Sequence, residues 1–206
     1  MAIEIVDPPG STPITPEQLK GLKRNFQYVA TQTELDAAEQ QVIAQGLAWA
    51  LHSRKLAKLS YLLSDAAVRR IHAEMFGSMY KWAGSYRLVE VAPVGVAPEQ
   101  IAVQTRLLCD DAHAWVQAET PAVEVAVRFH HRLVSIHPFA NGNGRHARMM
   151  ADLILIRHYG LTPLSWGGGD LKSEGAPRAA YHQALQQADA GNLQPLLAFA
   201  EQVAAE

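Results

Sequence analysis

The stretch His137-Pro-Phe-Ala-Asn-Gly-Asn-Gly-Arg-His-Ala-Arg148 lies between two strongly apolar segments of the chain. Pro138 disfavours the α conformation at His137, so the helix that precedes it should end there. A second helix should begin within Gly142–Gly144. The stretch therefore predicts two helices joined by a short loop that is unusually rich in polar residues.

The glycines on either side of Asn143 are typical of an anion-binding loop. Glycine adopts backbone conformations closed to other residues, so successive N–H groups of Gly142, Asn143 and Gly144 can point at one phosphate. The positive end of the helix dipole favours the same charge. Arg145 and Arg148 share one helix face, and their guanidinium groups match phosphate oxygens. We expect a polyphosphate to bind here.

His137 lies at the other end of the same loop. An imidazole titrates near neutral pH and can remove a proton from an attacking hydroxyl. Taken one by one, these residues have simpler explanations, because Gly-Asn-Gly is a common turn and a histidine before proline is often a capping or core residue. Their combination favours a catalytic site, since packing alone does not require so many special residues together. Phe139 is most simply an anchor of the loop to the core.

The rest of the chain predicts a mainly α-helical protein with one small β-hairpin. Residues 1–14 should be extended, and residues 1–206 should form a single domain. The hairpin is expected within Leu88–Val96, which is rich in β-branched residues and contains Pro and Gly. Helices are expected to start at Thr15, Thr33 and Ser64, and to cover Pro98–Ala118, Thr120–Ile136, Gly144–Tyr159, Pro177–Ala190 and Asn192 onwards.

Composition limits the classes of function. The 206 residues are 49% hydrophobic and 18% charged, with a net charge of −2, so no broad field attracts nucleic acid or an anionic membrane. The single cysteine, Cys109, cannot form an intramolecular disulfide, and we expect no secretory signal and no membrane-spanning segment. The sequence predicts a cytoplasmic protein with neither nucleic acid nor a membrane as partner.

The loop resembles the motif of the Fic family, His-x-Phe-x-(Asp/Glu)-Gly-Asn-Gly-Arg-x-x-Arg. Trp82-Ala-Gly-Ser-Tyr-Arg87 is similar to the family segment before the target-docking hairpin, and Tyr181 to Leu196 resembles its C-terminal part. The resemblance covers about residues 80–200. More narrowly, the chain resembles the bacterial Fic subgroup labelled mobile mystery protein B.

This resemblance implies a Fic-type helical domain that transfers AMP from ATP to a Ser, Thr or Tyr hydroxyl of a target protein. It implies that His137 is the general base, that Gly142, Asn143 and Gly144 form the anion hole, and that Arg145 and Arg148 hold the β- and γ-phosphates. Tyr181 either borders the adenine pocket or is a buried core residue. The target would add a strand to a flap made by Leu88, Val89, Glu90, Val91, Val94 and Val96.

Two departures from the family pattern affect the expected chemistry. Asn141 stands where most active members have the Asp or Glu that holds Mg²⁺, and a neutral amide oxygen is a weaker ligand for this hard cation. The inhibitory pattern Ser/Thr-x-x-x-Glu-Gly/Asn is matched only in part, by Thr120 and Glu124, where helix capping is the better explanation. We therefore expect any inhibition to come from a separate antitoxin-like protein that offers a Glu to Arg148.

Three functions remain open from the sequence. The first is an adenylyltransferase with ATP and Mg²⁺, as the toxin of a toxin–antitoxin pair. The second is another phosphotransferase, kinase-like, on the same fold, although the Gly-Asn-Gly cradle favours AMP transfer. The third is a nucleotide-binding or partner-binding module in which Asn141 has abolished catalysis.

Overall fold

The computed structural model describes residues 21–26, 29, 31–91, 95–168, 171 and 175–202. The predicted mainly helical fold is confirmed for these residues. The α-helices are α2 (Gln32–His52), α3 (Leu59–Leu62), α4 (Asp65–Phe76), α5 (Ile101–Gln117), α6 (Ala122–Ile136), α7 (Asn143–Ile154), α8 (Ala176–Asp189) and α9 (Gln194–Glu201). Short 3-10 segments cover Arg24–Phe26, Pro98–Gln100 and Trp166–Gly168, and a π-helical turn, Leu155–Tyr159, extends α7.

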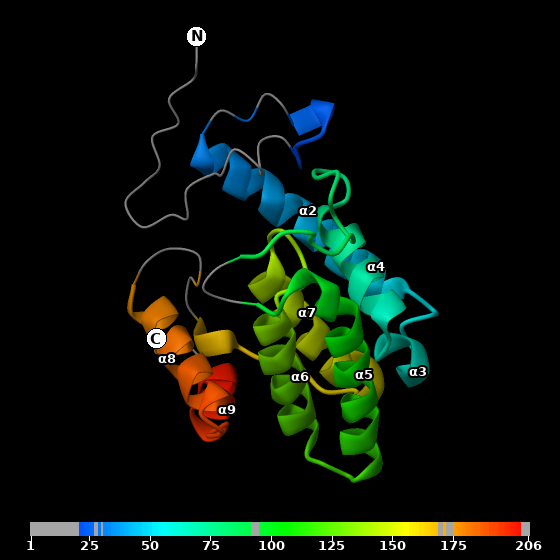
Figure 1. Ribbon diagram of the computed structural model, residues 1–206, viewed down its shortest axis with the longest axis vertical. Coiled ribbons are helices and arrows are strands. Elements are labelled where there is room, and N and C mark those ends of the chain that lie inside the picture. The colour runs from blue at the N-terminus through cyan, green and yellow to red at the C-terminus, as the bar shows by residue number, and fades with distance from the viewer. Residues whose placement is uncertain are drawn as a thin grey trace.

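Helices α6 and α7 pack against each other at the centre of the molecule (Figure 1). Helix α4 packs against both α7 and α2, α2 also contacts α7, and α5 lies along α6. Helices α8 and α9 pack together, and α9 contacts α6. The apolar residues form two buried clusters, and α6 and α7 supply side chains to both. The loop between α6 and α7 is thus held by packing on both sides.

Helix starts follow the capping residues closely. Ser64 caps α4 by accepting a hydrogen bond from the Ala67 N–H, as the sequence predicts. For α2 the predicted start at Thr33 is wrong by two residues, because the side chain of Thr31 caps the helix. Thr31 and Glu34 exchange reciprocal hydrogen bonds and form a complete capping box.

The predicted β-hairpin is not seen in the structure. Leu88–Val91 and Gly95–Val96 contain no strand, and the one β-bridge of the described residues joins Leu22 to Tyr80 instead. The physical reason is the Arg87 side chain, whose guanidinium donates to carbonyl oxygens on both arms of this segment. Those carbonyls therefore bond to a side chain and not to the opposite arm.

Some predictions fall outside the described residues. These are the extended segment 1–14, the helix start at Thr15 and flap residue Val94. Within the described ranges, no helix combines the length and apolar character needed to cross a bilayer.

Candidate active site

The loop between α6 and α7 is fastened by the side chain of Asn143. Its Oδ1 accepts a hydrogen bond from the Phe139 N–H at 2.9 Å, and its Nδ2 donates to the Phe139 carbonyl at 2.8 Å. Both residues are buried, and the Phe139 ring stacks on the His72 imidazole with centroids 3.7 Å apart. Phe139 is thus the expected anchor. Because the side-chain amide of Asn143 is hydrogen-bonded to the loop backbone, only the backbone N–H of Asn143 can bind an anion.

Gly142 and Gly144 are glycines for different reasons. Gly142 has φ 78° at the start of α7, and a Cβ there would lie 2.6 Å from the Phe76 ring. Only glycine fits both the conformation and the space. Gly144 lies within α7, where an added Cβ would meet only Arg148 Nη1, at 3.8 Å. The missing side chain at Gly144 leaves room directly beside a guanidinium.

His137 ends α6, as predicted, but in an unusual conformation. It has φ 52° and ψ 60°, in the left-handed region that non-glycine residues seldom adopt. Burial lowers the pKa of His137 below its usual value of 6.5, and the nearby Arg87 cation lowers it further, while the Val134 carbonyl opposes the shift. The imidazole is therefore neutral at pH 7 and able to accept a proton.

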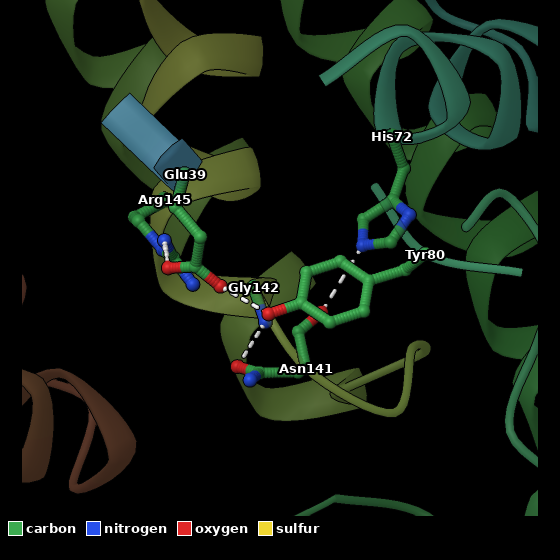
Figure 2. A network of polar contacts seen from close by, with 6 residues as sticks. All are labelled: Glu39, His72, Tyr80, Asn141, Gly142 and Arg145. Atoms are coloured by element: carbon green, nitrogen blue, oxygen red, sulfur yellow. Dashed lines mark hydrogen bonds and ion pairs between the residues drawn. The ribbon is translucent and has the colours of Figure 1, made fainter. Parts of the chain in front are cut away.

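Arg145 is paired with a carboxylate from α2. Its guanidinium forms an ion pair with Glu39, and the other Glu39 oxygen accepts a hydrogen bond of 2.9 Å from the Tyr80 hydroxyl (Figure 2). The face of Phe76 lies beneath the guanidinium, 5.1 Å from ring centroid to Cζ. Glu39 is almost fully buried, with 4% of its surface exposed. Of the two arginines expected to bind phosphate, Arg145 is therefore already paired with an acidic side chain.

The sequence does not single out Glu39, although a degenerate signal is present. Leu35-Asp-Ala-Ala-Glu39-Gln40 places a glutamate at the spacing of the inhibitory pattern, but Leu35 replaces Ser/Thr and Gln40 replaces Gly/Asn. The capping explanation for Thr120–Glu124 is wrong, because α6 has Pro121 at its N-cap and no side-chain cap. Glu124 instead accepts from Arg128 at 2.8 Å on the next turn of α6. Only the folded chain shows that α2 crosses beside α7.

Arg148 lies on the other side of the cradle, within the second apolar cluster. Its guanidinium lies over the ring of Tyr181, 5.7 Å from the centroid, and no acidic side chain of the described ranges forms an ion pair with it. The Tyr181 hydroxyl is 3.0 Å from His130 Nε2, and 6% of Tyr181 is exposed. Arg148 thus lies against an aromatic face without an ion pair in the described ranges, and the Asp152 carboxylate acts electrostatically on it.

Asn141 turns its side chain toward the loop itself. Its Oδ1 accepts from the Gly142 N–H at 2.6 Å, and its backbone carbonyl is 3.1 Å from His72 Nε2 (Figure 2). The Gly84 N–H donates to His72 Nδ1, so Nε2 carries the proton and donates to Asn141. The only oxygen that the Asn141 side chain offers to a cation is therefore neutral and already shared with a backbone amide.

No group of three or more acidic, histidine or cysteine side chains in the described ranges has the arrangement of a metal site. The free oxygen lone pair of Asn141 suits an ion that arrives with a nucleotide and keeps most of its ligands on phosphate and water. A resident metal held by protein ligands does not fit these residues.

The segment expected to dock a target is exposed at its first residues. Leu88 is 90% exposed and Val89 67% exposed, which is unusual for apolar side chains. Glu90 is also exposed, while Val91 and Val96 are partly buried. The structure therefore leaves two apolar side chains of this segment in solvent next to the end of the loop at His137.

Residues 62–155 match the model of the Fic/DOC family, and this range contains α4 to α7 and the whole loop. The chain is 33% identical over 137 residues to "Protein adenylyltransferase Fic" of Nematostella vectensis, covering 63% of this chain and 29% of that protein. It is 54% identical over 41 residues to "Uridine 5'-monophosphate transferase" of Xanthomonas campestris, covering 20% of this chain and 8% of that protein.

A solved structure shares the fold over most of both chains. BepC of Bartonella tribocorum, solved with bound AMPPNP, matches with a TM-score of 0.61 and 17% identity, covering 91% of this chain and 97% of that chain. Residues 62–155 thus resemble a Fic/DOC-family domain, and the likeness to BepC shows the shared fold alone. The chain spans less than a third of the length of the curated Nematostella relative, and the subgroup resemblance is not resolved by these matches.

The buried histidines around the loop predict a loss of stability in acid. Burial is the main cause that lowers the pKa of His72, His130 and His146, for His146 to about 3. In the unfolded chain these histidines bind protons near pH 6.5, whereas in the folded chain they stay neutral at that pH. We expect the free energy of unfolding to fall below about pH 6.5, by up to about 1.4 kcal/mol per pH unit for each histidine.

Asp152 acts in the opposite direction over part of this range. Burial raises its pKa from 3.8 to about 6, so between these values the folded state binds the extra proton and offsets one histidine. Urea unfolding at about pH 7, 6 and 5 measures the net effect. A constant free energy of unfolding across this range would contradict the burial of neutral histidines.

Proposed function

We propose that this protein transfers AMP from ATP to a hydroxyl group of a target protein. The observation that carries the proposal is the single loop that joins a neutral His137, at the end of α6, to a helix start with two arginines and a glycine cradle. The relative named as an adenylyltransferase and the similarly folded BepC with bound AMPPNP support it. The cytoplasm, where ATP is present, is the proposed compartment.

The proposed chemistry uses His137 as the general base. The target hydroxyl oxygen attacks the α-phosphorus, the bond from that phosphorus to the bridging oxygen breaks, and pyrophosphate leaves with the electron pair. His137 Nδ1 is buried, so Nε2 takes the hydroxyl proton. The N–H groups at the start of α7 and the guanidinium of Arg148 stabilise negative charge on the phosphates. The conformation at His137 is set before the nucleotide arrives.

Magnesium is part of this proposal through the nucleotide. Mg²⁺ bound to ATP would neutralise phosphate charge, and Asn141 Oδ1 would be its protein ligand. The flap residues Leu88 and Val89 would contact the target by apolar packing, with β-augmentation along the same segment. We propose that this pairing forms only when the target binds, because the free segment is not a strand.

We propose that Glu39 restrains the enzyme from within the chain. A nucleotide phosphate and the Glu39 carboxylate compete for the same guanidinium of Arg145. A separate antitoxin-like protein that offers a Glu to Arg148 remains a second proposal, since Arg148 has no ion pair within the described residues, and a toxin role depends on it. Arg145 would then be restrained by Glu39 of the same chain, and Arg148 by the separate antitoxin-like protein.

Two other reactions remain to be separated from AMP transfer. The short match to a uridine 5'-monophosphate transferase favours UTP as a second candidate nucleotide. A kinase-like reaction would transfer the γ-phosphate, and a binding module would transfer nothing. These outcomes differ in which labelled atom reaches protein.

Labelling with radioactive nucleotides tests the proposed function. The protein is incubated with Mg²⁺, a bacterial lysate and either α-labelled ATP, γ-labelled ATP or α-labelled UTP. We expect protein-bound label from α-labelled ATP, and a loss of about 10²-fold or more in His137→Ala because the general base is removed. Label from UTP alone or from the γ position, or equal label in His137→Ala, would contradict the proposal.

The role of Glu39 is tested by Glu39→Gln. Removing the charge frees the Arg145 guanidinium for phosphate, so we expect ATP to bind about tenfold more tightly, equivalent to about 1.4 kcal/mol. Isothermal titration calorimetry measures this affinity. Glu74→Gln is the matched control, because Glu74 pairs with Arg70 within α4 and lies outside the cradle. If Glu39→Gln binds ATP no better than the control does, Glu39 is not inhibitory.

The metal proposal is tested by Asn141→Asp. A carboxylate binds the hard Mg²⁺ ion better than an amide, so the Mg²⁺ concentration for half-maximal AMP transfer should fall by about tenfold. Asn192→Asp, in the exposed turn between α8 and α9, adds the same charge away from the loop and should change nothing. An unchanged Mg²⁺ requirement in Asn141→Asp would remove position 141 from the metal site.

A further inference from the structure

Arg87 is a buried cation whose guanidinium, within the described residues, donates hydrogen bonds to backbone carbonyls alone. Only 4% of the residue is exposed. Its Nε donates to the His137 carbonyl at 2.7 Å, its Nη1 to the Val89 carbonyl at 2.7 Å, and its Nη2 to the Val96 carbonyl. One planar side chain thus binds three separate backbone segments.

The backbone around Arg87 strengthens the same arrangement. The Arg87 N–H donates to the Pro138 carbonyl at 2.9 Å, and the Val96 N–H donates to the Ile136 carbonyl at 3.2 Å. The flap segment is therefore joined to the end of α6 on both sides of His137. These are the contacts that replace a hairpin ladder.

Gly95 lies so close to this guanidinium that no side chain would fit at its position. It has φ 97°, and a Cβ there would lie 2.6 Å from Arg87 Nη2 and 3.0 Å from the His137 Cβ. A buried cation persists only where its donors are hydrogen-bonded. The arginine guanidinium presents five N–H groups on a rigid plane and can donate to all three carbonyls at once. A lysine ammonium is a compact group without this planar arrangement of donors.

We propose that Arg87 is a positioning residue, whose guanidinium holds the left-handed His137 and both arms of the target-docking segment in one fixed geometry. The base and the segment on which the target would dock are then both held by one side chain. The target hydroxyl is thereby brought to the base in a fixed orientation. This inference deepens the proposed AMP transfer and depends on it for its kinetic consequences. Arg87 itself touches neither nucleotide nor the reacting atoms.

The charge of Arg87 also acts on His137. After burial, this cation is the next cause that lowers the pKa of His137, and the Val134 carbonyl opposes it. Glu90, on the same segment, acts on Arg87 in turn. A purely structural role for Arg87 would not affect the titration of the imidazole, so titration separates the two roles.

The experiment compares Arg87→Gln and Arg87→Lys with the unsubstituted protein. Arg69→Gln is the matched control, because Arg69 Nε also donates to a backbone carbonyl, that of Gly84 at 3.0 Å. Its guanidinium lies over the Tyr86 ring, 5.3 Å from the centroid, and holds neither arm of the flap. Steady-state AMP transfer gives kcat and the KM for ATP. NMR titration of ¹³C-labelled histidine gives the pKa of His137, assigned by its absence from the spectrum of His137→Ala.

We expect Arg87→Gln to lower kcat by more than about tenfold and to leave the KM for ATP within about twofold, because the phosphate cradle is intact. The pKa of His137 should rise toward its ordinary value. Arg87→Lys keeps the charge and loses the planar guanidinium, so His137 should still titrate low while kcat stays reduced. Arg69→Gln should match the wild type in both measurements.

The proposal is overturned if Arg87→Gln retains wild-type kcat and His137 pKa, or if Arg87→Lys restores full kcat. Thermal melting reports whether each variant folds, and Arg87→Lys alone decides the positioning role if Arg87→Gln does not fold. If the wild type transfers no AMP, the proposed function fails. The NMR titration still measures whether Arg87 acts on His137, so the two failures are distinguishable.

Discussion

The reversal of the chain between α6 and α7 is the constraint on which the rest of the site depends. Asn143 closes it with two hydrogen bonds to the backbone of Phe139, and Phe139 is buried against His72. Because both ends of the loop are fixed in this way, the strained His137 and the positive-φ Gly142 are both kept in place. A base and an anion-binding helix start thus remain next to each other.

Three distant segments add side chains to this loop, two of them charged and one aromatic. Helix α2 brings Glu39 to Arg145, the segment after α4 brings Arg87 to the His137 backbone, and α8 brings Tyr181 under Arg148. Each contact joins the loop to a different part of the core. The loop therefore combines a locally determined backbone with an electrostatic environment that is assembled from the whole domain.

Local signals in the sequence predicted most of the helices, because capping residues and proline act within a few positions along the chain. Ser64 and Pro138 set helix ends where expected, whereas at α2 the capping box of Thr31 and Glu34 moved the start by two residues. The hairpin prediction was wrong for a tertiary reason. β-branched residues favour strands in general, but here the Arg87 side chain occupies the carbonyls that a ladder would use.

The sequence alone determined the helix–loop–helix unit, the left-handed glycine at its centre and the pairing of a histidine with two arginines, since all of these follow from residues within one short segment. Only the tertiary structure decided which charges surround them. Glu39 and Arg145 are separated by 106 positions, and Arg87 and His137 by 50. Interactions over such separations depend on how helices pack, and no local pattern encodes them.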